Sequence, residues 1–468
     1  MRWFGNGWPN QNHCMRVAIF SPLPPQRSGI AHYTAELLSL LSREHEIDLY
    51  TDGVQPHSTI NSLVNVFDAH DFVWKRKHAS YEHVIYQLGN ATCHDYMWPY
   101  LAHYPGHIVL HDGHVHHSRA QSLLSQKKHD AYRAEFAFSH SDCPTDVAEL
   151  GVQGLLGNLT YFWPMLGVPM TVARSVSVHN ARLAEELQRC YSHSTINTIR
   201  MGVTDPTSTL EDSARHSTRD ILGFSSEHVV FATYGGLTPE KRIPQILRAV
   251  EKLKETHPLI RILLVGNPVS HYDARADAHA LGIEHLVTFT DYVADADLPK
   301  YLAAADVYLC LRWPSTGETS ASMIRCLAMG KPIVTTDLAL NRDMPMLLTP
   351  WAWTLSHPWK DTVDEKPLGV AIDILDEDHS LEITLRRLGN DSSLRNQLGV
   401  RARQYWESHH RLEMMAEDYE QLLNNDATAT MPPYSRIPVA DNYIRNHVNN
   451  LLCAFGVTPD ILKPEEPV

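Results

Sequence analysis

Residues 315–337 read STGETSASMIRCLAMGKPIVTTD, and this stretch joins a polar loop, a helix and a strand within one short segment. The spacing of its apolar residues predicts a helix over residues 320–329. Gly330 supplies a left-handed stop at the end of that helix, and Pro332 prevents it from continuing. The apolar run that starts at Ile333 predicts a buried strand. A helix followed directly by a buried strand is the repeating unit of a parallel α/β sheet.

The same alternation extends in both directions from this stretch. The predicted strands are 17–20, 47–50, 83–86, 108–110, 176–178, 229–233, 262–265, 286–289, 307–311 and 333–335, and the predicted helices include 30–41, 243–253 and 298–304. A polar passage over residues 204–218 interrupts the pattern and predicts a linker. The sequence therefore predicts two doubly wound parallel-sheet α/β domains, 15–203 and 219–410. Ligands of such sheets bind where the carboxyl ends of the strands meet the loops.

Composition excludes several classes of protein. The 468-residue chain has a formal net charge of −14, which argues against general affinity for nucleic acid or anionic lipid, because both need a basic surface. The dense basic run at residues 73–78 predicts a solvated turn. No apolar run is long enough to span a membrane, and the seven scattered cysteines indicate neither a disulfide framework nor a thiolate zinc site. We therefore expect a cytoplasmic protein with no nucleic-acid partner and no transmembrane segment, and peripheral contact with a membrane stays open.

Two loops that follow predicted strands carry glycines. Ser28 and Gly29 open the helix that starts at Ile30, where backbone N–H groups can approach an anion. A glycine at such a place also serves as a plain turn, and the pattern does not choose between the two interpretations. Gly236 lies in the loop YGGLTPEKR after the strand at 229–233 and is a second candidate for close approach of a ligand.

The second loop ends in two cations, Lys241 and Arg242, at the N-terminal end of the helix predicted over residues 243–253. A cation at that end of a helix is unfavourable by about 0.3–1 kcal/mol unless an anion lies against it. A bound diphosphate would turn this cost into stabilisation. The alternative is that both cations point away and pair with Glu240 or with a distant carboxylate.

Polar residues also crowd the start of the helix at 320–329. The hydroxyls of Thr319 and Ser320 can cap its first turn without any ligand. Capping does not require Glu318, whose carboxylate could accept hydrogen bonds from sugar hydroxyls. The alternative for Glu318 is a favourable negative charge near a helix N-terminus.

A histidine-rich stretch, VLHDGHVHHSRA at residues 109–120, follows the strand at 108–110. Asp112 could orient His111 or bind an acceptor hydroxyl. The same stretch, with His114, His116 and His117, contains residue types that bind zinc, so a metal-dependent hydrolase is a competing hypothesis. The chain has 29 dispersed histidines, which makes chance clusters expected.

The motifs SPLPPQRSGIAHYTAELL, GGLTPEKR and LRWPSTGETSASMIRCLAMGKPIVTTD, in this order, resemble those of glycosyltransferase family 4 over roughly residues 15–423. The resemblance implies the GT-B fold, in which two Rossmann-like domains face each other across a cleft. It implies a nucleotide-sugar donor as co-substrate, held mainly by the second domain, and an acceptor held mainly by the first. It also implies transfer with retention and without an obligatory metal or other cofactor. Residues 411–468 would form a helix that crosses back to the first domain and a tail, and residues 1–14 an N-terminal extension.

The resemblance also assigns roles to individual residues. Lys241 matches the lysine on the donor diphosphate, Arg242 follows it as a second phosphate ligand, and the Gly29 amide approaches the same diphosphate. Glu318, supported by the amides of the residues that follow it, resembles the first glutamate of a Glu-x7-Glu motif that contacts the donor sugar. His111 lies where the family often carries a histidine that faces that sugar.

The second glutamate of the Glu-x7-Glu motif is absent, because the alignment places Arg325 or Cys326 at its position. Recognition of the ribose and the base is therefore left open. The leading hypothesis is a retaining, metal-independent glycosyltransferase of glycan or glycolipid biosynthesis, whose acceptor is a saccharide, a lipid-linked saccharide or a small polyol. A metal-dependent hydrolase at residues 111–117 and an inactive nucleotide-sugar-binding homologue are the alternatives.

Overall fold

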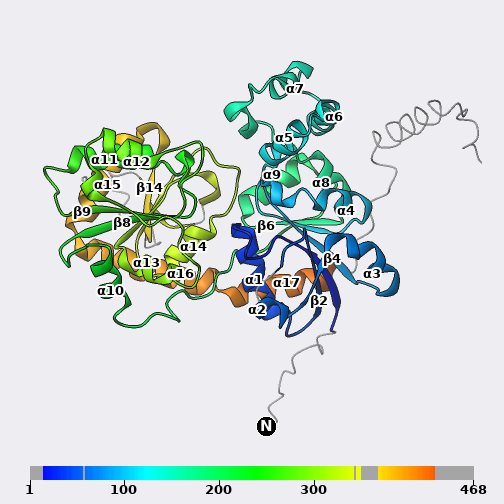
Figure 1. The fold of residues 1–468 in the computed structure, drawn as a ribbon, viewed down its shortest axis with the longest axis horizontal. Helices are drawn as coiled ribbons and strands as arrows, with labels where there is room; N and C mark the ends of the chain where they lie inside the picture. The colour runs from blue at the N-terminus through cyan, green and yellow to red at the C-terminus, as the bar shows by residue number, and fades with distance from the viewer. Residues whose placement is uncertain (1–13, 56–57, 342–343, 349–366, 427–468) are drawn as a thin grey trace, which may run out of the picture.

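The computed structural model describes residues 14–55, 58–341, 344–348 and 367–426. These residues form two α/β domains that lie side by side, each built on a seven-stranded sheet (Figure 1). The strand orders are β3-β2-β1-β4-β5-β6-β7 and β10-β9-β8-β11-β12-β14-β13, and every pairing between these strands is parallel. The order reverses next to β1 and next to β8, which is where doubly wound sheets bind ligands. The predicted pair of doubly wound parallel sheets is confirmed.

All ten predicted strands are present. The first sheet contains β1 (Arg16–Phe20), β2 (Glu46–Thr51), β3 (Asn65–Asp68), β4 (His83–Leu88), β5 (His107–Leu110), β6 (Ser175–Val178) and β7 (Ile196–Thr198). The second contains β8 (Val229–Tyr234), β9 (Ile260–Val265), β10 (Val287–Phe289), β11 (Val307–Cys310), β12 (Ile333–Thr336), β13 (Met346–Leu348) and β14 (Gly369–Ile372). The strands β3, β7, β13 and β14 were not predicted. β3 and β7 are partly exposed edge strands, so they lack a continuous apolar run.

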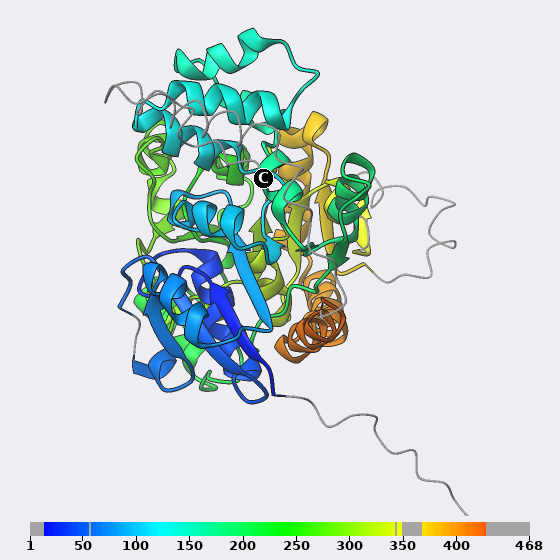
Figure 2. The same ribbon diagram turned by 90° about the vertical axis from the view of Figure 1, so that its right-hand side faces the viewer.

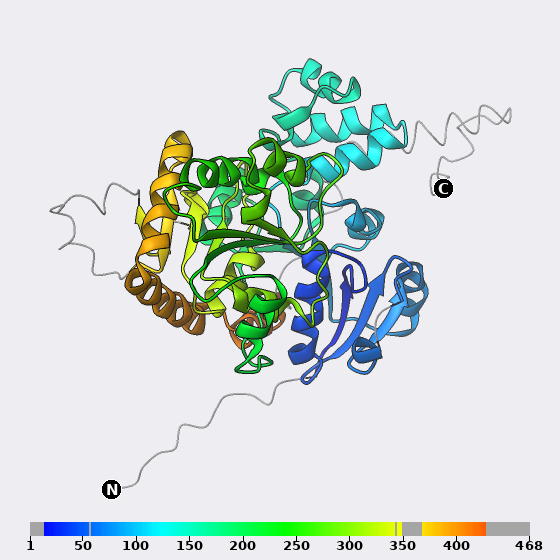
Figure 3. The same ribbon diagram turned by 60° about the vertical axis from the view of Figure 1, so that its left-hand side comes forward.

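Helices cover the sheets and connect their strands. In the first domain they are α1 (Gly29–Leu41), α2 (Ser58–Asn61), α3 (Phe72–His78), α4 (Met97–His103), α5 (His116–Ser125), α6 (His129–Ser139), α7 (Thr145–Val152), α8 (Gly167–Val172) and α9 (Ala181–Cys190). In the second they are α10 (Ala214–Ile221), α11 (Ile243–Leu253), α12 (Ala274–Ala280), α13 (Leu298–Ala304), α14 (Ala321–Ala328), α15 (Glu377–Asn390) and α16 (Ser392–His409), followed by α17 (Leu412–Asp426). The cyan helices α5–α7 project from the first domain, as Figures 2 and 3 show from two sides. In the part of the chain that the structure describes, no helix is long and apolar enough to cross a membrane.

The basic run at residues 73–78 is helical, so the predicted turn is wrong. It forms most of α3, which is anchored by the fully buried ring of Phe72. Lys75 Nζ lies 3.5 Å from the centre of the Phe67 ring, and the Arg76 guanidinium lies 4.8 Å from the centre of the Tyr104 ring. These aromatic contacts hold the basic residues in a helix that charge alone did not predict.

Part of the predicted linker between the two domains is helical. Residues 204–213 contain no helix or strand, whereas α10 begins at Ala214, inside the stretch predicted as a linker. Arg215 Nη2 and Arg219 Nη1 of α10 lie 2.6 and 3.2 Å from the carboxylate of Asp306, next to β11. These ion pairs fix α10 to the second domain.

The last described helix, α17, lies against α1 of the first domain (Figure 1). The hydroxyl of its fully buried Tyr419 lies 2.9 Å from the hydroxyl of Tyr33 in α1 and accepts a hydrogen bond of 2.9 Å from Gln87 Nε2 in β4. Asp418 pairs with Arg200 at 2.6 Å. One apolar cluster runs from α1 through α17 to α14 and α16, so the core is continuous between the two domains.

We expect Tyr419→Phe to lower the free energy of unfolding by about 1–3 kcal/mol, because it leaves two buried polar groups without their shared partner. Urea denaturation measures the change. Tyr292→Phe is the matched control, since this tyrosine is 47% exposed, and it should shift stability by less than about 0.5 kcal/mol. Equal effects of the two substitutions would contradict a role for the buried network.

Candidate active site

Three hollows meet where the carboxyl ends of the two sheets face each other. The first, cleft A, has a volume of about 700 Å³ and is lined by residues that include Asn90, His111, Asp112, Tyr161 and Glu318. The second, cleft B, has a volume of about 740 Å³ and is lined by residues that include Gly29, Glu36, Gly235, Tyr292 and Arg325. A smaller inner cavity is lined by residues that include Tyr234, Lys241, Cys310, Arg312 and Cys326. Ser322, in the first turn of α14, lines all three hollows, so the N-terminus of α14 marks their junction.

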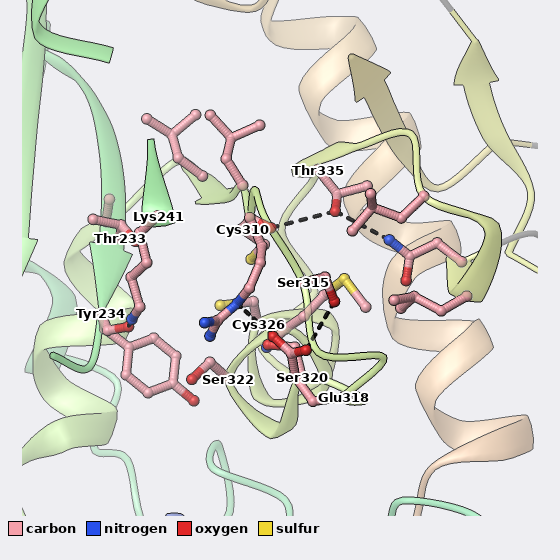
Figure 4. A pocket seen from close by; sticks show the side chains of 18 residues that line it. Thr233, Tyr234, Lys241, Cys310, Ser315, Glu318, Ser320, Ser322, Cys326 and Thr335 are labelled. Atoms are coloured by element: carbon pink, nitrogen blue, oxygen red, sulfur yellow. Dashed lines mark hydrogen bonds and ion pairs between the residues drawn. The ribbon is translucent and has the colours of Figure 1, made fainter. Parts of the chain in front are cut away.

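Lys241 lies at the end of a single 3-10 turn, Pro239–Lys241, and its amine points into the inner cavity (Figure 4). The amine donates a hydrogen bond to the backbone oxygen of Tyr234. A Cβ at Gly235 would lie 2.7 Å from Nζ, and Gly235 has a φ of +95°, so only glycine fits beside this lysine. Burial, with the nearby charge of Arg312, lowers the pKa of Lys241 to about 7. An anion in the cavity would raise this pKa again and would itself be stabilised.

Arg242 is placed differently from the sequence expectation. Its Nε donates to Glu377 Oε1 at 2.8 Å, its Nη2 contacts Glu377 Oε2, and it lines none of the three hollows. Both side chains are largely buried, at 19% and 7% exposure. Arg242 adopts a left-handed conformation, with φ +60°, at the start of α11, and α11 packs against α15, which begins at Glu377. The alternative of a distant carboxylate therefore holds for Arg242.

Glu318 lies on the wall between cleft A and the inner cavity, and its own loop holds it in place (Figure 4). Its Oε2 accepts hydrogen bonds of 2.8 Å from Ser315 Oγ and from both N and Oγ1 of Thr316. Its Oε1 lies 2.8 Å from Arg312 Nε. One lone pair of Oε1 therefore stays open to a donor in the cleft.

The N-termini of α14 and α1 face the same junction. Ser320 caps α14, since its Oγ accepts a hydrogen bond of 3.2 Å from Met323 N, and the helix starts one residue later than predicted. Thr319 Oγ1 accepts a hydrogen bond of 3.2 Å from Asn180 of the first domain. Ser28 caps α1 in the same way, with its Oγ 3.2 Å from Ile30 N.

Two predicted glycines line cleft B without crowding it. A Cβ at Gly29 would meet no atom within 4 Å, so packing does not require glycine there and the backbone is open to a ligand. Gly236 also lines cleft B, next to Gly235. Exposed backbone at both glycine loops gives an anion access to N–H groups from the two domains.

His111 lies at the base of cleft A, but both of its ring nitrogens are occupied. Nε2 lies 2.8 Å from Gln87 Oε1, and Nδ1 lies 3.2 Å from Nε2 of His179. The ring is 7% exposed and meets the ring of Tyr33 edge-on. Burial, together with the neighbouring histidines, lowers the pKa of His111 well below its usual range. His111 is therefore a neutral member of the buried network that reaches Tyr419, and it offers no free ring nitrogen to the cleft.

The other histidines of this stretch diverge. His116 Nε2 lies 2.8 Å from the hydroxyl of Tyr132, and His114 Nδ1 lies 3.5 Å from the backbone oxygen of Thr160. Among the described residues, no three histidine, cysteine, aspartate or glutamate side chains gather in a way that could hold a metal ion. The hydrolase hypothesis therefore has no ligand set in the described part of the chain.

Asp112 joins the two domains. Its Oδ2 accepts a hydrogen bond of 2.8 Å from Asn90 N, and its Oδ1 lies 3.0 Å from Thr316 Oγ1, whose single hydroxyl hydrogen is shared between Asp112 and Glu318. Burial, reinforced by the charge of Glu318, raises the pKa of Asp112 to about 6. The carboxylate therefore changes charge close to neutral pH.

Sequence reasoning missed three residues at this junction. Gly235 precedes the glycine that was singled out, and the doubled glycine in YGGLTPEKR was the available signal. Arg312 comes directly after the last predicted residue of its strand, where a charged side chain faces the loops. Ser322 was not predicted, because a serine inside a helix belongs to no distinctive sequence pattern.

Comparison with known proteins found a family model and a curated relative that match part of the chain. Residues 214–344 match the family model described as glycosyl transferases group 1. Mannosylfructose-phosphate synthase from Agrobacterium fabrum is 29% identical over 136 residues. That alignment covers 27% of this chain and 29% of the relative, so it spans less than a third of either protein.

Solved structures share the fold over most of the chain. HepE from Anabaena, solved in complex with UDP and glucose, has a TM-score of 0.55 at 14% identity and covers 88% of this chain and 100% of its own. Sucrose-phosphate synthase from Thermosynechococcus elongatus has a TM-score of 0.58 at 16% identity, with coverage of 89% and 100%. A glycosyltransferase from Rickettsia africae has a TM-score of 0.59 at 12% identity, with the same coverage. These likenesses show the GT-B fold.

We expect Arg242→Gln to lower the free energy of unfolding by about 3 kcal/mol, because it leaves the buried Glu377 without a partner. Glu377→Gln should have a similar cost, and the double variant should cost less than the sum of the two. Urea denaturation measures all three. Costs that simply add in the double variant would contradict a buried pair of Arg242 and Glu377.

Proposed function

We propose that the protein is a retaining glycosyltransferase of family 4, which moves a sugar from a nucleotide-sugar donor to a hydroxyl acceptor in the cytoplasm. The observation that carries the proposal is the junction of the three hollows. There the Lys241 amine, the first turn of α14 and the open backbone of Gly29 and Gly236 converge from facing parallel sheets. This combination of a cation, a helix N-terminus and exposed N–H groups suits a diphosphate.

The donor diphosphate would lie at this junction. When the glycosidic bond to the nucleotide breaks, negative charge builds on the leaving phosphate oxygens. Lys241 and the N–H groups of the α14 first turn are positioned before the reaction, so they stabilise that charge without reorganising. In the described residues no carboxylate forms an ion pair with Lys241, which leaves its charge available to the diphosphate.

The acceptor would occupy cleft A. Its charged lining includes the carboxylates of Asp112, Glu240 and Glu318, and Arg312 is the single lysine or arginine among the described lining residues. Because Arg312 is paired with Glu318, a phosphorylated acceptor would meet an excess of negative charge. A neutral hydroxyl-bearing acceptor fits better, such as a saccharide, the sugar of a lipid-linked saccharide or a small polyol. Such products belong to glycan or glycolipid biosynthesis.

Retention without a covalent enzyme intermediate is part of the proposal. Asp112 and Glu318 are carboxylates that line cleft A, and both already accept hydrogen bonds from neighbouring groups. We therefore favour attack by the acceptor hydroxyl on the same face from which the diphosphate leaves, with that phosphate accepting the proton. No cofactor and no metal ion enter this scheme. An inactive nucleotide-sugar-binding homologue would bind the donor but form no product.

A thermal-shift panel of UDP, GDP, ADP and dTDP, with and without EDTA, tests the donor site. A ligand that binds the folded state raises the melting temperature. We expect a shift with one nucleotide that survives EDTA and is lost in Lys241→Ala, together with at least a tenfold loss of turnover in that variant.

The pKa of Lys241 predicts the direction in which nucleotide affinity changes with pH. The protonated amine binds the diphosphate, so affinity should fall about tenfold between pH 6 and pH 8, across the pKa of about 7. Lys241→Arg should bind without this pH dependence, since arginine stays charged. Titration calorimetry measures both proteins. Binding that requires a divalent metal, or a fall in affinity with rising pH that persists in Lys241→Arg, would contradict the assignment.

Asp112 should control the pH profile of the reaction if its ionised form binds the acceptor hydroxyl. Because burial raises its pKa to about 6, kcat/KM should rise between pH 5 and pH 7 with an inflection near 6. Asp112→Asn should lower kcat/KM at pH 7.5 by about tenfold or more and flatten this rise. The exposed Asp142→Asn is the control and should keep the wild-type profile. An unchanged rise in Asp112→Asn would show that another group titrates.

A further inference from the structure

A pair of an arginine and a glutamate crosses between the domains inside cleft B. Arg325 of α14 places Nη1 at 3.0 Å from Glu36 Oε1 and Nη2 at 2.8 Å from Glu36 Oε2, and Glu36 lies in α1 of the first domain. The two side chains are 19% and 21% exposed, and both line the cleft. Arg325 stands at one of the two positions where the motif in residues 315–337 would carry a second glutamate. The carboxylate at this point of the cleft therefore comes from the opposite domain.

Glu36 is the carboxylate of cleft B that is best placed to bind a ligand. Asp205 also lines this cleft, but its oxygens bond to Arg403 at 2.9 and 2.6 Å and to Thr207 at 2.7 and 2.9 Å. Asp295 is 58% exposed and lies 3.3 Å from His32. Arg325 takes one lone pair on each oxygen of Glu36, so one lone pair on each oxygen stays free. Glu36 thus presents two adjacent acceptor sites in a partly buried, charge-neutral pair.

The walls of cleft B fit a nucleoside next to the diphosphate. Strands β8, β9 and β10 are neighbours in the second sheet, so the loops after them, at Gly235, Gly266 and Tyr292, follow one another along its edge. The first two offer backbone without side chains. The Tyr292 ring is covered by the Arg27 guanidinium at 4.1 Å and supplies a flat apolar surface. Glu36 and Arg325, on α1 and α14, line the same cleft as the glycine loops and Tyr292.

We propose that Glu36 accepts hydrogen bonds from the 2′- and 3′-hydroxyls of the donor ribose, and that Arg325 holds and neutralises its carboxylate. This inference rests on the proposed function. A cis-diol offers two donors side by side, which matches the two free acceptor sites, and carboxylates serve ribose hydroxyls in this way in dinucleotide-binding folds. Neutralisation by Arg325 keeps the carboxylate from repelling the nearby diphosphate.

The arrangement has a consequence for donor binding. The diphosphate would contact mainly the second domain, whereas the ribose would contact a residue of the first. The ribose would therefore be recognised only while α1 and α14 are apposed, as they are in this structure.

The test compares each nucleoside diphosphate with its 2′-deoxy counterpart. Titration calorimetry gives the ratio of dissociation constants for 2′-deoxy-UDP over UDP, and likewise for ADP and GDP. A hydrogen bond to a charged group predicts a ratio of about ten or more in the wild-type protein. Glu36→Ala should lower the ratio to about two or less. Glu44→Ala, at an exposed position just after α1, is the matched control and should keep the wild-type ratio.

A second variant controls for destabilisation of the protein by Glu36→Ala. Glu36→Ala leaves Arg325 without its partner, so Glu36→Ala/Arg325→Leu removes the pair together and should show the same loss of discrimination. The ratio compares two ligands on one protein, so a general loss of stability does not move it.

The outcomes separate the two proposals. A wild-type ratio near one, a ratio unchanged in both Glu36 variants, or loss of discrimination in Asp295→Ala instead would overturn the role of Glu36 while the donor site at Lys241 stands. Binding of dTDP alone, which has no 2′-hydroxyl, would likewise overturn the role of Glu36 only. Failure of the wild-type protein to bind UDP, ADP, GDP or dTDP would remove the proposed function and this inference together.

Discussion

Parallel strand pairing is the constraint on which the rest of this structure depends. Every strand of a parallel sheet delivers its carboxyl end to the same edge, so the loops after β1, β4 and β5 gather at one edge of the first sheet, and those after β8 and β11 gather at one edge of the second. The return of α17 to α1 adds to the continuous apolar core that joins the domains. The site is thus assembled largely by backbone hydrogen bonds and apolar burial.

The pairing of charges decides which cation can serve a ligand. Arg242, Arg312 and Arg325 are each held by one glutamate, respectively Glu377, Glu318 and Glu36. Within the described residues Lys241 forms no ion pair with a carboxylate, and burial lowers its pKa to about 7. A partly buried cation without a counter-charge is unfavourable in the empty protein and favourable beside a diphosphate. The arginines position the loops and helices around it.

Much of the fold and part of the site could be predicted from the sequence. Helix α13 has the predicted bounds, and α11 and all ten predicted strands lie where apolar periodicity placed them, because burial on both faces leaves a strong local signal. Gly29 and Lys241 were singled out from their position after a strand, and both line the hollows, while their roles stay predictions. The basic run in α3 was misjudged because its helix depends on Phe72 and on aromatic rings elsewhere in the chain.

By itself the sequence determined the two parallel sheets, the glycine loops at their edges and the presence of cations and carboxylates beside those loops. Only the tertiary structure decided which charges meet, since Arg242 and Glu377 lie 135 positions apart, Thr316 and Asp112 lie 204 apart, and Arg325 and Glu36 lie 289 apart. Local periodicity reports whether a residue is buried or exposed in its own element. The partner of a charged side chain depends on how distant elements pack, because an ion pair requires a few ångströms in space and no fixed separation in sequence.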